Sequence, residues 1–528
     1  MPAHRILYAA THRFSKLVED HAAGDPFLDD FRSFPSTHAG LEQAASARAF
    51  SAEHRSVLVK ALHRQYEGID IEGPVRENID RLSQPDALTV TTGHQLCLFT
   101  GPLYFPFKLL NTIRLARTLS GELKRPVVPI FWMASEDHDR AEIDHAWLAG
   151  KKIQWPGASG GAVGRLTLKG IEAVLAEVDD ILGAGMDADR VRVELRRCYT
   201  PGSTLAEATR RFVHALFGRF GLVILDGDDR ELKKLFMPVM REELLNGITQ
   251  RSVSYADERL KERYPSQAHA RTINVFHLRP GYRSRIEADG DHYQVLDGGP
   301  RFTLDELLLD LEVRPQDYSP NVLLRPVYQE VVLPNIAYIG GGGELAYWMQ
   351  LKWLFQAVQA PMPVVLLRTS AAFLSAKQGK QRGELGLSIE DLFKPAHELR
   401  DRVAHHFSVL DTDVVDEQQE LDAFFQRLRT RTAAVDATLG ASTDAAQVRA
   451  QRLLMNLQGK MDRALRRKEK VHIDRLDGVL EALFPAGGLQ ERRDNLLPML
   501  AAHGPELLDR LLETLDPLNM HFTVISED

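Results

Sequence analysis

Short apolar runs alternate with helical patterns along the first two thirds of the chain. Each run is continuous rather than alternating, which is typical of a strand that is covered on both faces. Small or polar residues end each run, and apolar positions at helical spacing follow. The five runs are residues 87–92, 127–133, 221–225, 335–339 and 364–367. This alternation predicts an α/β fold with a doubly wound parallel sheet.

Three helices are expected directly after these strands. Apolar residues at Phe107, Leu110 and Ile113 indicate a helix after the first run. A second helix is expected to start near Glu231, and a third to cover residues 344–359. Their connections to the runs predict helices packed on both faces of the sheet.

Two segments interrupt this core, which we expect to cover residues 1–374. They are residues 146–205 and residues 251–320, and both are interpreted as insertions. The second contains alternating runs at 282–286 and 292–296, with turns at Asp289-Gly290 and Asp297-Gly298-Gly299. Alternation bounded by such turns predicts a small antiparallel hairpin unit.

Residues 375–484 carry a different pattern, in which apolar positions recur at spacings of three, four and seven. The two series are Leu421, Phe424, Leu428, Val435 and Leu439, then Leu454, Leu457, Met461 and Leu465. Residues 440–444 contain helix-capping types and are interpreted as the break between them. We expect an antiparallel coiled-coil arm that serves packing or dimerisation, after which residues 485–528 return to the core.

Composition narrows the class of protein. The chain has 528 residues, of which 44% are hydrophobic, and a formal charge of −8. That length predicts two or three structural units, and that charge argues against a general nucleic-acid binder. The two cysteines exclude a disulfide framework in practice. No signal peptide or apolar span is evident, so we expect a cytoplasmic protein without a membrane partner.

Polar residues cluster where the expected strands end. Ligands of parallel sheets bind beyond the carboxyl ends of the strands, so these clusters are the candidate site. The acidic stretch FWMASEDHDRAEIDH, residues 131–145, resembles a metal site at first sight. However, His138 and His145 are seven residues apart, not the four that place two ligands on one helical face. We expect no permanent metal here.

Two interpretations of the acidic stretch remain. Its carboxylates complement the dipole and cap the amides of a helix that begins after the strand. One or two of Glu136, Asp137 and His138 also face the crevice as ligand or acid–base groups.

Gly93 and His94 lie where the first strand meets a helix. An imidazolium there would neutralise phosphate charge beside free backbone amides, or the histidine would merely cap the turn. Cys97 follows three residues later. A catalytic cysteine–histidine pair is conceivable, but the apolar surroundings of Cys97 favour a buried structural thiol.

The tetraglycine at residues 340–343 would let a substrate approach the backbone closely. No Lys-Ser or Lys-Thr follows, so this is not the phosphate loop of ATPases. Glu344 would repel a phosphate and suits ribose hydroxyls or a substrate amine better. A plain strand-to-helix turn is the alternative interpretation.

Four segments together resemble one known family. They are TTGHQLCLFTGPLYFPFKLLNTIRLA, VPIFWMASEDHDRAEIDH, NVLLRPVYQEVVLPNIAYIGGGGELAYW and LQERRDNLLPML. The chain resembles the cysteine ligase family of bacillithiol biosynthesis, the BshC family. The resemblance implies a Rossmann-like core with two connecting insertions and a coiled coil that supports a homodimer. It also implies addition of cysteine to the amine of glucosaminyl malate.

The core of that family is similar to nucleotidylyltransferases and class I aminoacyl-tRNA synthetases. Their His-Ile-Gly-His signature maps onto residues 91–94, where only Gly93 and His94 match. Their lysine-rich signature has a faint echo at residues 375–380. Four glycines stand where the family is expected to have Gly-Gly-Pro-Gly.

The resemblance implies a mechanism in which ATP, with Mg²⁺, activates the cysteine carboxylate as an acyl-adenylate. ATP would lie over Gly93 with His94 near its phosphates, and Asp137 or His138 would be the base. Arg325 and Arg368 would bind the malate carboxylates. The expected nucleotide- or substrate-binding residues are Gly93, Gln95, Lys108, Glu136, Arg325, Tyr328, Gly341, Gly342, Glu344 and Arg368. The alternatives are a non-catalytic nucleotide-binding scaffold of thiol metabolism and a nucleotidylyltransferase.

Overall fold

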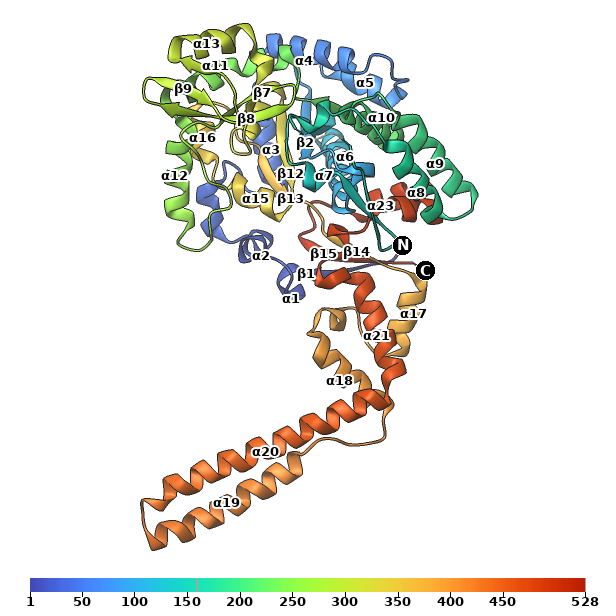
Figure 1. Cartoon of the computed structure of the whole chain (residues 1–528), viewed down its shortest axis with the longest axis vertical. Coiled ribbons are helices and arrows are strands. Elements are labelled where there is room, and N and C mark those ends of the chain that lie inside the picture. The colour runs from blue at the N-terminus through green and yellow to red at the C-terminus, as the bar shows by residue number, and fades with distance from the viewer. Residues whose placement is uncertain (158–159, 528) are drawn as a thin grey trace. The chain divides into compact units, whose positions relative to one another are not determined.

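A computed structural model describes residues 1–157 and 160–527 (Figure 1). The chain forms two compact units. The larger holds Ala3–Ala372 and Leu489–Thr523, and the smaller holds Phe373–Gly488 with the last described residues. Among the described residues, no helix is both long enough and apolar enough to cross a membrane.

The centre of the larger unit is a five-stranded sheet. Its strands are β2 (Leu88–His94), β3 (Val127–Met133), β6 (Val223–Asp226), β12 (Asn335–Gly340) and β13 (Val364–Leu367). They pair in the order β13-β12-β2-β3-β6, and every pairing is parallel. In this register His94 lies beside Met133, and Met133 lies beside Asp226. The predicted parallel sheet is confirmed, and its carboxyl ends meet at one edge.

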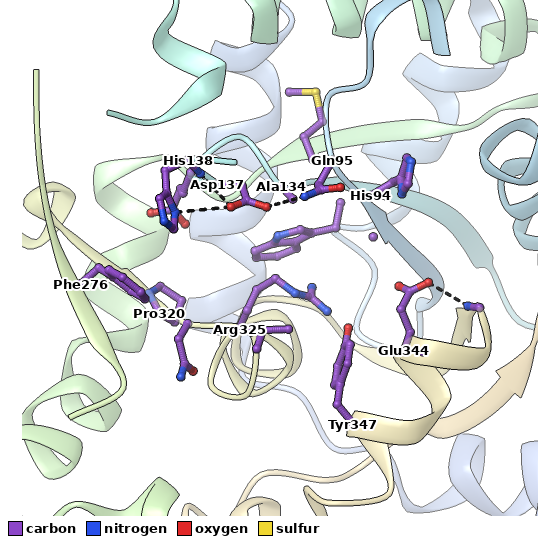
Figure 2. Close-up of a pocket in the computed structure, with 18 of the residues that line it drawn as sticks. His94, Gln95, Ala134, Asp137, His138, Phe276, Pro320, Arg325, Glu344 and Tyr347 are labelled. Atoms are coloured by element: carbon purple, nitrogen blue, oxygen red, sulfur yellow. Dashed lines mark hydrogen bonds and ion pairs between the residues drawn. The ribbon is translucent and has the colours of Figure 1, made fainter. Parts of the chain in front are cut away.

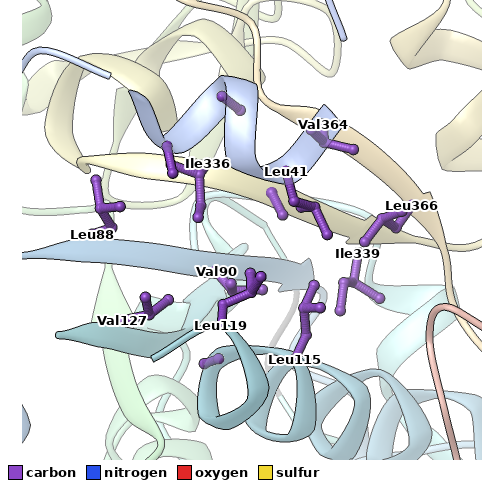
Figure 3. Close-up of a cluster of buried hydrophobic side chains, with 14 residues drawn as sticks. Leu41, Leu88, Val90, Leu115, Leu119, Val127, Ile336, Ile339, Val364 and Leu366 are labelled. Atoms are coloured by element: carbon purple, nitrogen blue, oxygen red, sulfur yellow. The ribbon is translucent and has the colours of Figure 1, made fainter. Parts of the chain in front are cut away.

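Helices cover both faces of this sheet. Figure 3 shows α3 (His38–Ala47) on one face and α6 (Tyr104–Leu123) on the other, with aliphatic side chains between. Leu41 of α3 packs with Ile336 and Leu366, while Leu115 of α6 belongs to the same buried cluster. Burial of each such side chain contributes about 1.5–3 kcal/mol, so both faces of the strands had to be apolar. That is why the strands appear as continuous apolar runs.

The remaining elements before β6 lie outside this sheet. At the N-terminal end they are β1 (Ala3–Leu7), α1 (Tyr8–Thr11), α2 (Lys16–Ala23), η1 (Pro26–Phe31), α4 (Ala52–Gln65), α5 (Gly73–Arg81) and η2 (Leu98–Thr100). Between β3 and β6 they are α7 (Arg140–Ile143), β4 (His145–Leu148), β5 (Lys151–Gln154), η3 (Val163–Arg165), α8 (Ile171–Leu182), α9 (Met186–Cys198), α10 (Leu205–Phe217) and η4 (Gly218–Phe220).

The second insertion is an antiparallel sheet in the order β10-β9-β8-β7-β11. Its strands are β7 (Val275–Arg279), β8 (Tyr282–Asp289), β9 (His292–Val295), β10 (Arg301–Thr303) and β11 (Tyr318–Pro320). Asp289 pairs with His292 across the Asp-Gly turn, which confirms the predicted hairpin. Before β12 the chain also forms α11 (Arg230–Asn246), α12 (Ile248–Leu260), α13 (Leu304–Val313), η5 (Pro315–Asp317) and α14 (Arg325–Val332).

The predicted helix after the first strand is confirmed as α6, but the second prediction was wrong. In the sequence, α6 begins at Tyr104 and not directly after His94, because residues 95–103 form a connection that contains the short η2. The helix expected over residues 344–359 is broken into α15 (Gly342–Trp348) and α16 (Lys352–Ala357). Gln350 lies in the break, and its buried amide donates to Asp257 of α12 at 2.6 Å. Local spacing could not reveal that tertiary contact.

The smaller unit contains the predicted helical hairpin, α19 (Val415–Val435) and α20 (Leu439–Lys468), which run side by side (Figure 1). The break lies at residues 436–438 and not at 440–444, which belong to α20. Asp436 makes the turn, since its Oδ1 accepts from the backbone N and the hydroxyl of Thr438. The unit's other elements are α17 (Ala376–Glu384), η6 (Glu390–Phe393), α18 (Ala396–Phe407), α21 (Lys470–Leu483) and η7 (Pro485–Gly487).

The C-terminal segment from Leu489 belongs to the larger unit as far as Thr523. It contains η8 (Gln490–Arg492), α22 (Leu497–His503) and α23 (Glu506–Thr514). The chain passes between the units within β14 (Ala371–Leu374) and again within β15 (His521–Ser526).

Candidate functional site

A cavity of about 630 Å³ lies beyond the carboxyl ends of β2, β3 and β12, beside the inserted sheet (Figure 2). All of the predicted site residues line it except Lys108 and Tyr328. The lining includes Gly93, His94, Gln95, Tyr104, Glu136, Asp137, His138, Arg271, Phe276, Arg283, Arg285, Pro320, Arg325, Tyr338, Gly341, Gly342, Glu344, Tyr347, Arg368 and Arg492. The structure thus brings together residues that are far apart in the sequence.

Positive charge predominates on the wall of the cavity. Three carboxylates line it, from Glu136, Asp137 and Glu344. Six arginines line it as well: Arg271, Arg283, Arg285, Arg325, Arg368 and Arg492. Guanidinium groups bind carboxylates and phosphates in a bidentate manner, so the cavity favours an anionic ligand.

His94 ends β2 and lies within the aromatic side of the cavity. Its ring stacks on Phe105 with centroids 4.5 Å apart, and it meets Tyr104 edge to face at 5.3 Å. Burial, with nearby Lys108 in addition, lowers the pKa of His94 to about 3. His94 is therefore neutral at physiological pH, and not the imidazolium considered from the sequence. Although α6 starts ten residues later in the chain, its first two residues, Tyr104 and Phe105, are the ones whose rings contact His94.

The loop after His94 is held by the C-terminal segment. Cys97 is buried, its Sγ lies 3.7 Å from His94 Nε2, and burial raises the pKa of its thiol to about 12. This confirms Cys97 as a buried thiol. Two carbonyls of the loop, of Phe99 and Gly101, accept hydrogen bonds of 2.8 and 2.7 Å from the Asn495 amide. Sequence spacing gave no signal for Asn495.

Lys108 lies buried beneath the cavity, where it supports two site residues without lining the cavity itself. Its Nζ donates to the carbonyl oxygen of Gly93 at 2.5 Å and to Glu344 Oε2 at 2.7 Å. Glu344 also accepts from the Tyr338 hydroxyl and from the Gly341 amide, at 2.5 and 2.8 Å. Burial alone would raise the pKa of Glu344, but Lys108 and the Gly341 amide bring it below its ordinary value.

Glu344 is thus already occupied by protein donors. Its carboxylate closes the turn that the tetraglycine forms, because the Gly341 amide is bound to it. Two donors bind its Oε2 and one binds its Oε1, so a ribose hydroxyl or an amine would have to bind the remaining lone pair of Oε1 or displace one of these donors.

The carboxylates of the acidic stretch point to different partners. Glu136 Oε1 lies 2.6 Å from the buried Nζ of Lys233, which is also 3.2 Å from Asp228. Glu142 accepts from Gln95 at 2.5 Å. Within residues 1–157 and 160–527, no group of three or more His, Cys, Asp or Glu is arranged to hold a metal ion.

One interpretation of the sequence was that the acidic residues cap a helix, and they do not. The helix that follows, α7, is a single turn, and the side chain of its N-cap residue Asp139 makes no capping bond. Asp137 instead binds its own loop, where its Oδ1 accepts from the amides of His138 and Asp139 at 2.7 and 3.4 Å.

Asp137 lies between His138 and Gln95 on the cavity wall (Figure 2). Its Oδ2 accepts from Gln95 Nε2 at 2.8 Å. Burial would raise its pKa, but the bond from Gln95, the charge of Arg283 and the loop amides lower it below the ordinary value. Asp137 is therefore an ionised carboxylate that faces the cavity at neutral pH.

Both insertions hold this loop in place. From the first, the amides of Val163 and Gly164 donate to the carbonyls of Asp137 and Ser135, at 2.7 and 2.8 Å. From the second, Arg283 Nη1 on β8 lies 3.0 Å from His138 Nδ1. Both insertions therefore contribute residues that support the site. The sequence analysis did not identify Arg283 as one of them.

The two arginines expected to bind carboxylates differ in availability. Arg325 begins α14; its Nη1 donates to Gln329 at 3.1 Å, while its Nη2 is buried without a hydrogen-bond partner among the described residues. Arg368 follows β13, and Glu491 holds both of its terminal nitrogens at 2.8 Å. Tyr328 lies away from the cavity, where its hydroxyl donates to the Gly227 carbonyl at 2.7 Å.

Comparison with known proteins gives matches over almost the whole chain. Residues 1–369 match the N-terminal Rossmann-like domain of the bacillithiol biosynthesis protein BshC, and residues 371–527 match its C-terminal coiled-coil domain. A protein of Flavobacterium johnsoniae named "Putative cysteine ligase BshC" is 36% identical, with all of both chains covered. Its namesakes from Flavobacterium psychrophilum and Christiangramia forsetii are 36% and 35% identical over at least 99% of both chains. The architecture and these matches agree, and the chain belongs to the BshC family.

Proposed function

We propose that this chain is a ligase that joins the carboxyl group of cysteine to the amine of glucosaminyl malate in bacillithiol biosynthesis. The relatives are named for a cysteine ligase. The observation that carries the proposal is the excess of arginine over carboxylate in a cavity at the carboxyl edge of the sheet. Both substrates bring carboxylates, two from the malate group and one from cysteine.

Arg325 is the best candidate to bind a substrate carboxylate. A buried N–H without a partner costs free energy, and an anionic oxygen would satisfy it. Arg271 and Arg492 line the same cavity and form no ion pair in the part of the chain described. Arg368 contributes positive charge, but its N–H groups already bind Glu491.

Amide formation from a free carboxylate requires activation, and we propose ATP with Mg²⁺ as the co-substrate. The cysteine carboxylate would displace pyrophosphate from the α-phosphorus, and the sugar amine would then displace AMP from the acyl carbon. His94, being neutral, would act as a hydrogen-bond donor near the phosphates and not as a cation. Gly93 leaves room beside it, since a Cβ there would lie 3.2 Å from the Tyr338 hydroxyl.

Asp137 is the proposed base. Its lowered pKa makes it a weak base, so it would accept the proton only after the new C–N bond has made the nitrogen acidic. Gln95 and the loop amides keep it oriented in the meantime.

We further propose that α19 and α20 mediate a homodimer. The hairpin exposes many apolar side chains that would be buried by a second copy: Phe424, Val435, Leu439, Val448, Leu453, Met455 and Leu457. Exposed apolar surface of this extent marks an interaction site.

The test is incubation of the purified chain with cysteine, glucosaminyl malate and ATP–Mg²⁺, with mass detection of the thiol product. Product together with AMP supports the adenylating ligase. Product without ATP contradicts the proposed activation, and no product in any tube contradicts the ligase. Pyrophosphate exchange with a sugar phosphate in the absence of cysteine would identify a nucleotidylyltransferase instead.

A further inference from the structure

His138 is the one imidazole of the acidic loop that lines the cavity, and a single contact defines its protonation. Its Nδ1 lies 3.0 Å from Arg283 Nη1 and 3.6 Å from Asp137 Oδ1. About half of its side chain is exposed. No protein group within the described residues binds its Nε2.

Arg283 can only donate in this contact. A guanidinium has five N–H groups and no acceptor, and it stays protonated in proteins. The nitrogen that it meets must therefore carry a lone pair. Because a neutral imidazole has one N–H, the proton of His138 must then be on Nε2, the nitrogen that is open to the cavity.

Arg283 is itself held firmly. Its Nε donates to the Ser319 hydroxyl at 3.1 Å and its Nη2 to the Pro320 carbonyl at 2.9 Å. The guanidinium carbon lies 4.0 Å from the centre of the Phe276 ring. These three contacts, with residues of β7 and β11, orient Nη1 toward His138. The position of Arg283 is therefore fixed by the inserted sheet and not by the Rossmann-like core.

The charges around His138 oppose each other. Burial and the charge of Arg283 lower the pKa of His138, while Asp137, Asp139 and Asp297 raise it, and the net shift is downward. Of the two nearest charged groups, Arg283 is the closer one, at 3.0 Å from Nδ1 against 3.6 Å for Asp137.

We propose that Arg283 is a positioning residue that fixes His138 as a neutral imidazole with its proton on Nε2, so that His138 meets the substrate as a hydrogen-bond donor and not as a base. The acceptor would be an anionic oxygen, from a carboxylate or a phosphoryl group. The identity of this acceptor rests on the proposed function, whereas the protonation of His138 does not. Because His138 is a donor in this proposal, Asp137 is the proton acceptor of the site.

The experiment is a pH titration of the full-length chain with ¹³C- and ¹⁵N-labelled histidine, followed by NMR. His138→Gln identifies the His138 signals by their loss. The expected wild-type spectrum near pH 7 has the proton on Nε2 and a bare Nδ1. A wild-type spectrum with the proton on Nδ1, or with a charged ring, would overturn the proposal. This result needs no variant of Arg283 and does not depend on what the chain catalyses.

Arg283→Gln should raise the midpoint of His138 by about one pH unit, because the aspartates then act without the opposing charge. Arg283→Lys keeps the charge, so its midpoint should stay nearer that of the wild type. Arg285→Gln is the matched control: Arg285 lies on the same strand and lines the same cavity but does not contact His138. An unchanged midpoint in Arg283→Gln, or an equal rise in Arg285→Gln, would refute the role of Arg283.

Two additions to the labelled protein identify the acceptor. Malate supplies carboxylates alone, and ATP–Mg²⁺ supplies phosphoryl oxygens. The Nε2–H signal should shift with one of them and be lost in His138→Gln. A shift with neither would refute the donor role while leaving the ligase assay to judge the proposed function separately.

Discussion

Arg368 and Glu491 are joined by two hydrogen bonds of 2.8 Å, although 123 residues separate them in the chain. Both side chains are buried. Glu491 Oε2 also accepts from the amide of Ala371 at 2.9 Å, so both oxygens of the carboxylate are hydrogen-bonded. This pair fastens the C-terminal segment to the end of β13 and holds Arg368 on the wall of the cavity.

Removal of one partner should therefore be costly. Glu491→Ala leaves a buried guanidinium without its counter-charge, and we expect it to lower the free energy of unfolding by about 3–5 kcal/mol. Urea unfolding followed by circular dichroism measures the change. The double variant Arg368→Met/Glu491→Met removes both charges and should lose less stability than Glu491→Ala alone. A larger loss in the double variant would show that the ion pair is not the source of the effect.

Acid should reveal the neutral state of His94. Its folded pKa of about 3 lies below the ordinary 6.5, so between these values the unfolded chain binds a proton that the folded chain does not. The stability that His94 contributes is full above pH 6.5 and is lost as the pH falls toward 3, by up to about 1.4 kcal/mol per pH unit.

His94→Gln abolishes this titration, so its free energy of unfolding should fall less steeply than that of the wild type as the pH is lowered. Parallel urea titrations between pH 6.5 and 4 compare the two slopes. His21 and His277, whose pKa values burial lowers to about 4, are present in both proteins and cancel. Equal slopes would mean that His94 is protonated in the folded chain.

Gly93→Ala should disturb the floor of the cavity. The added Cβ would lie 3.2 Å from the Tyr338 hydroxyl and 3.4 Å from Arg325 Nη1. We expect a loss of about 1–3 kcal/mol in the free energy of unfolding, as for other overpacked sites. Gly343→Ala is the control, since its nearest neighbour, Gln267 Nε2, is 3.9 Å away. A loss of equal size at Gly343 would remove the steric explanation.

The arm should determine the oligomeric state. Light scattering after size-exclusion chromatography should give twice the 59.4 kDa of one chain. The double variant Leu453→Glu/Leu457→Glu places charges among the exposed apolar residues of α20 and should yield monomers. Arg452→Glu changes an exposed polar position of the same helix and should remain dimeric. A monomeric wild type would contradict the proposed interface.

The five strands of the central sheet could be predicted from the sequence because their signal is local. A strand buried on both faces must be apolar at every position, and such runs end where polar side chains reach the cavity. The hairpin of α19 and α20 was predictable for a similar reason, since its apolar spacing repeats over many turns. Placement of His94, Asp137 and Glu344 at one sheet edge followed from the parallel topology alone.

Only the tertiary structure decided the state of those side chains. Whether His94 is charged depends on its burial against Phe105, and whether Arg368 is free depends on Glu491 from the C-terminal segment. The proton of His138 is placed by Arg283, which an inserted sheet delivers. Periodicity records which face of an element is covered, but not which residue covers it. Hydrogen bonds and pKa values depend on the residue that covers each side chain. Only the tertiary structure therefore determines the chemistry of this site.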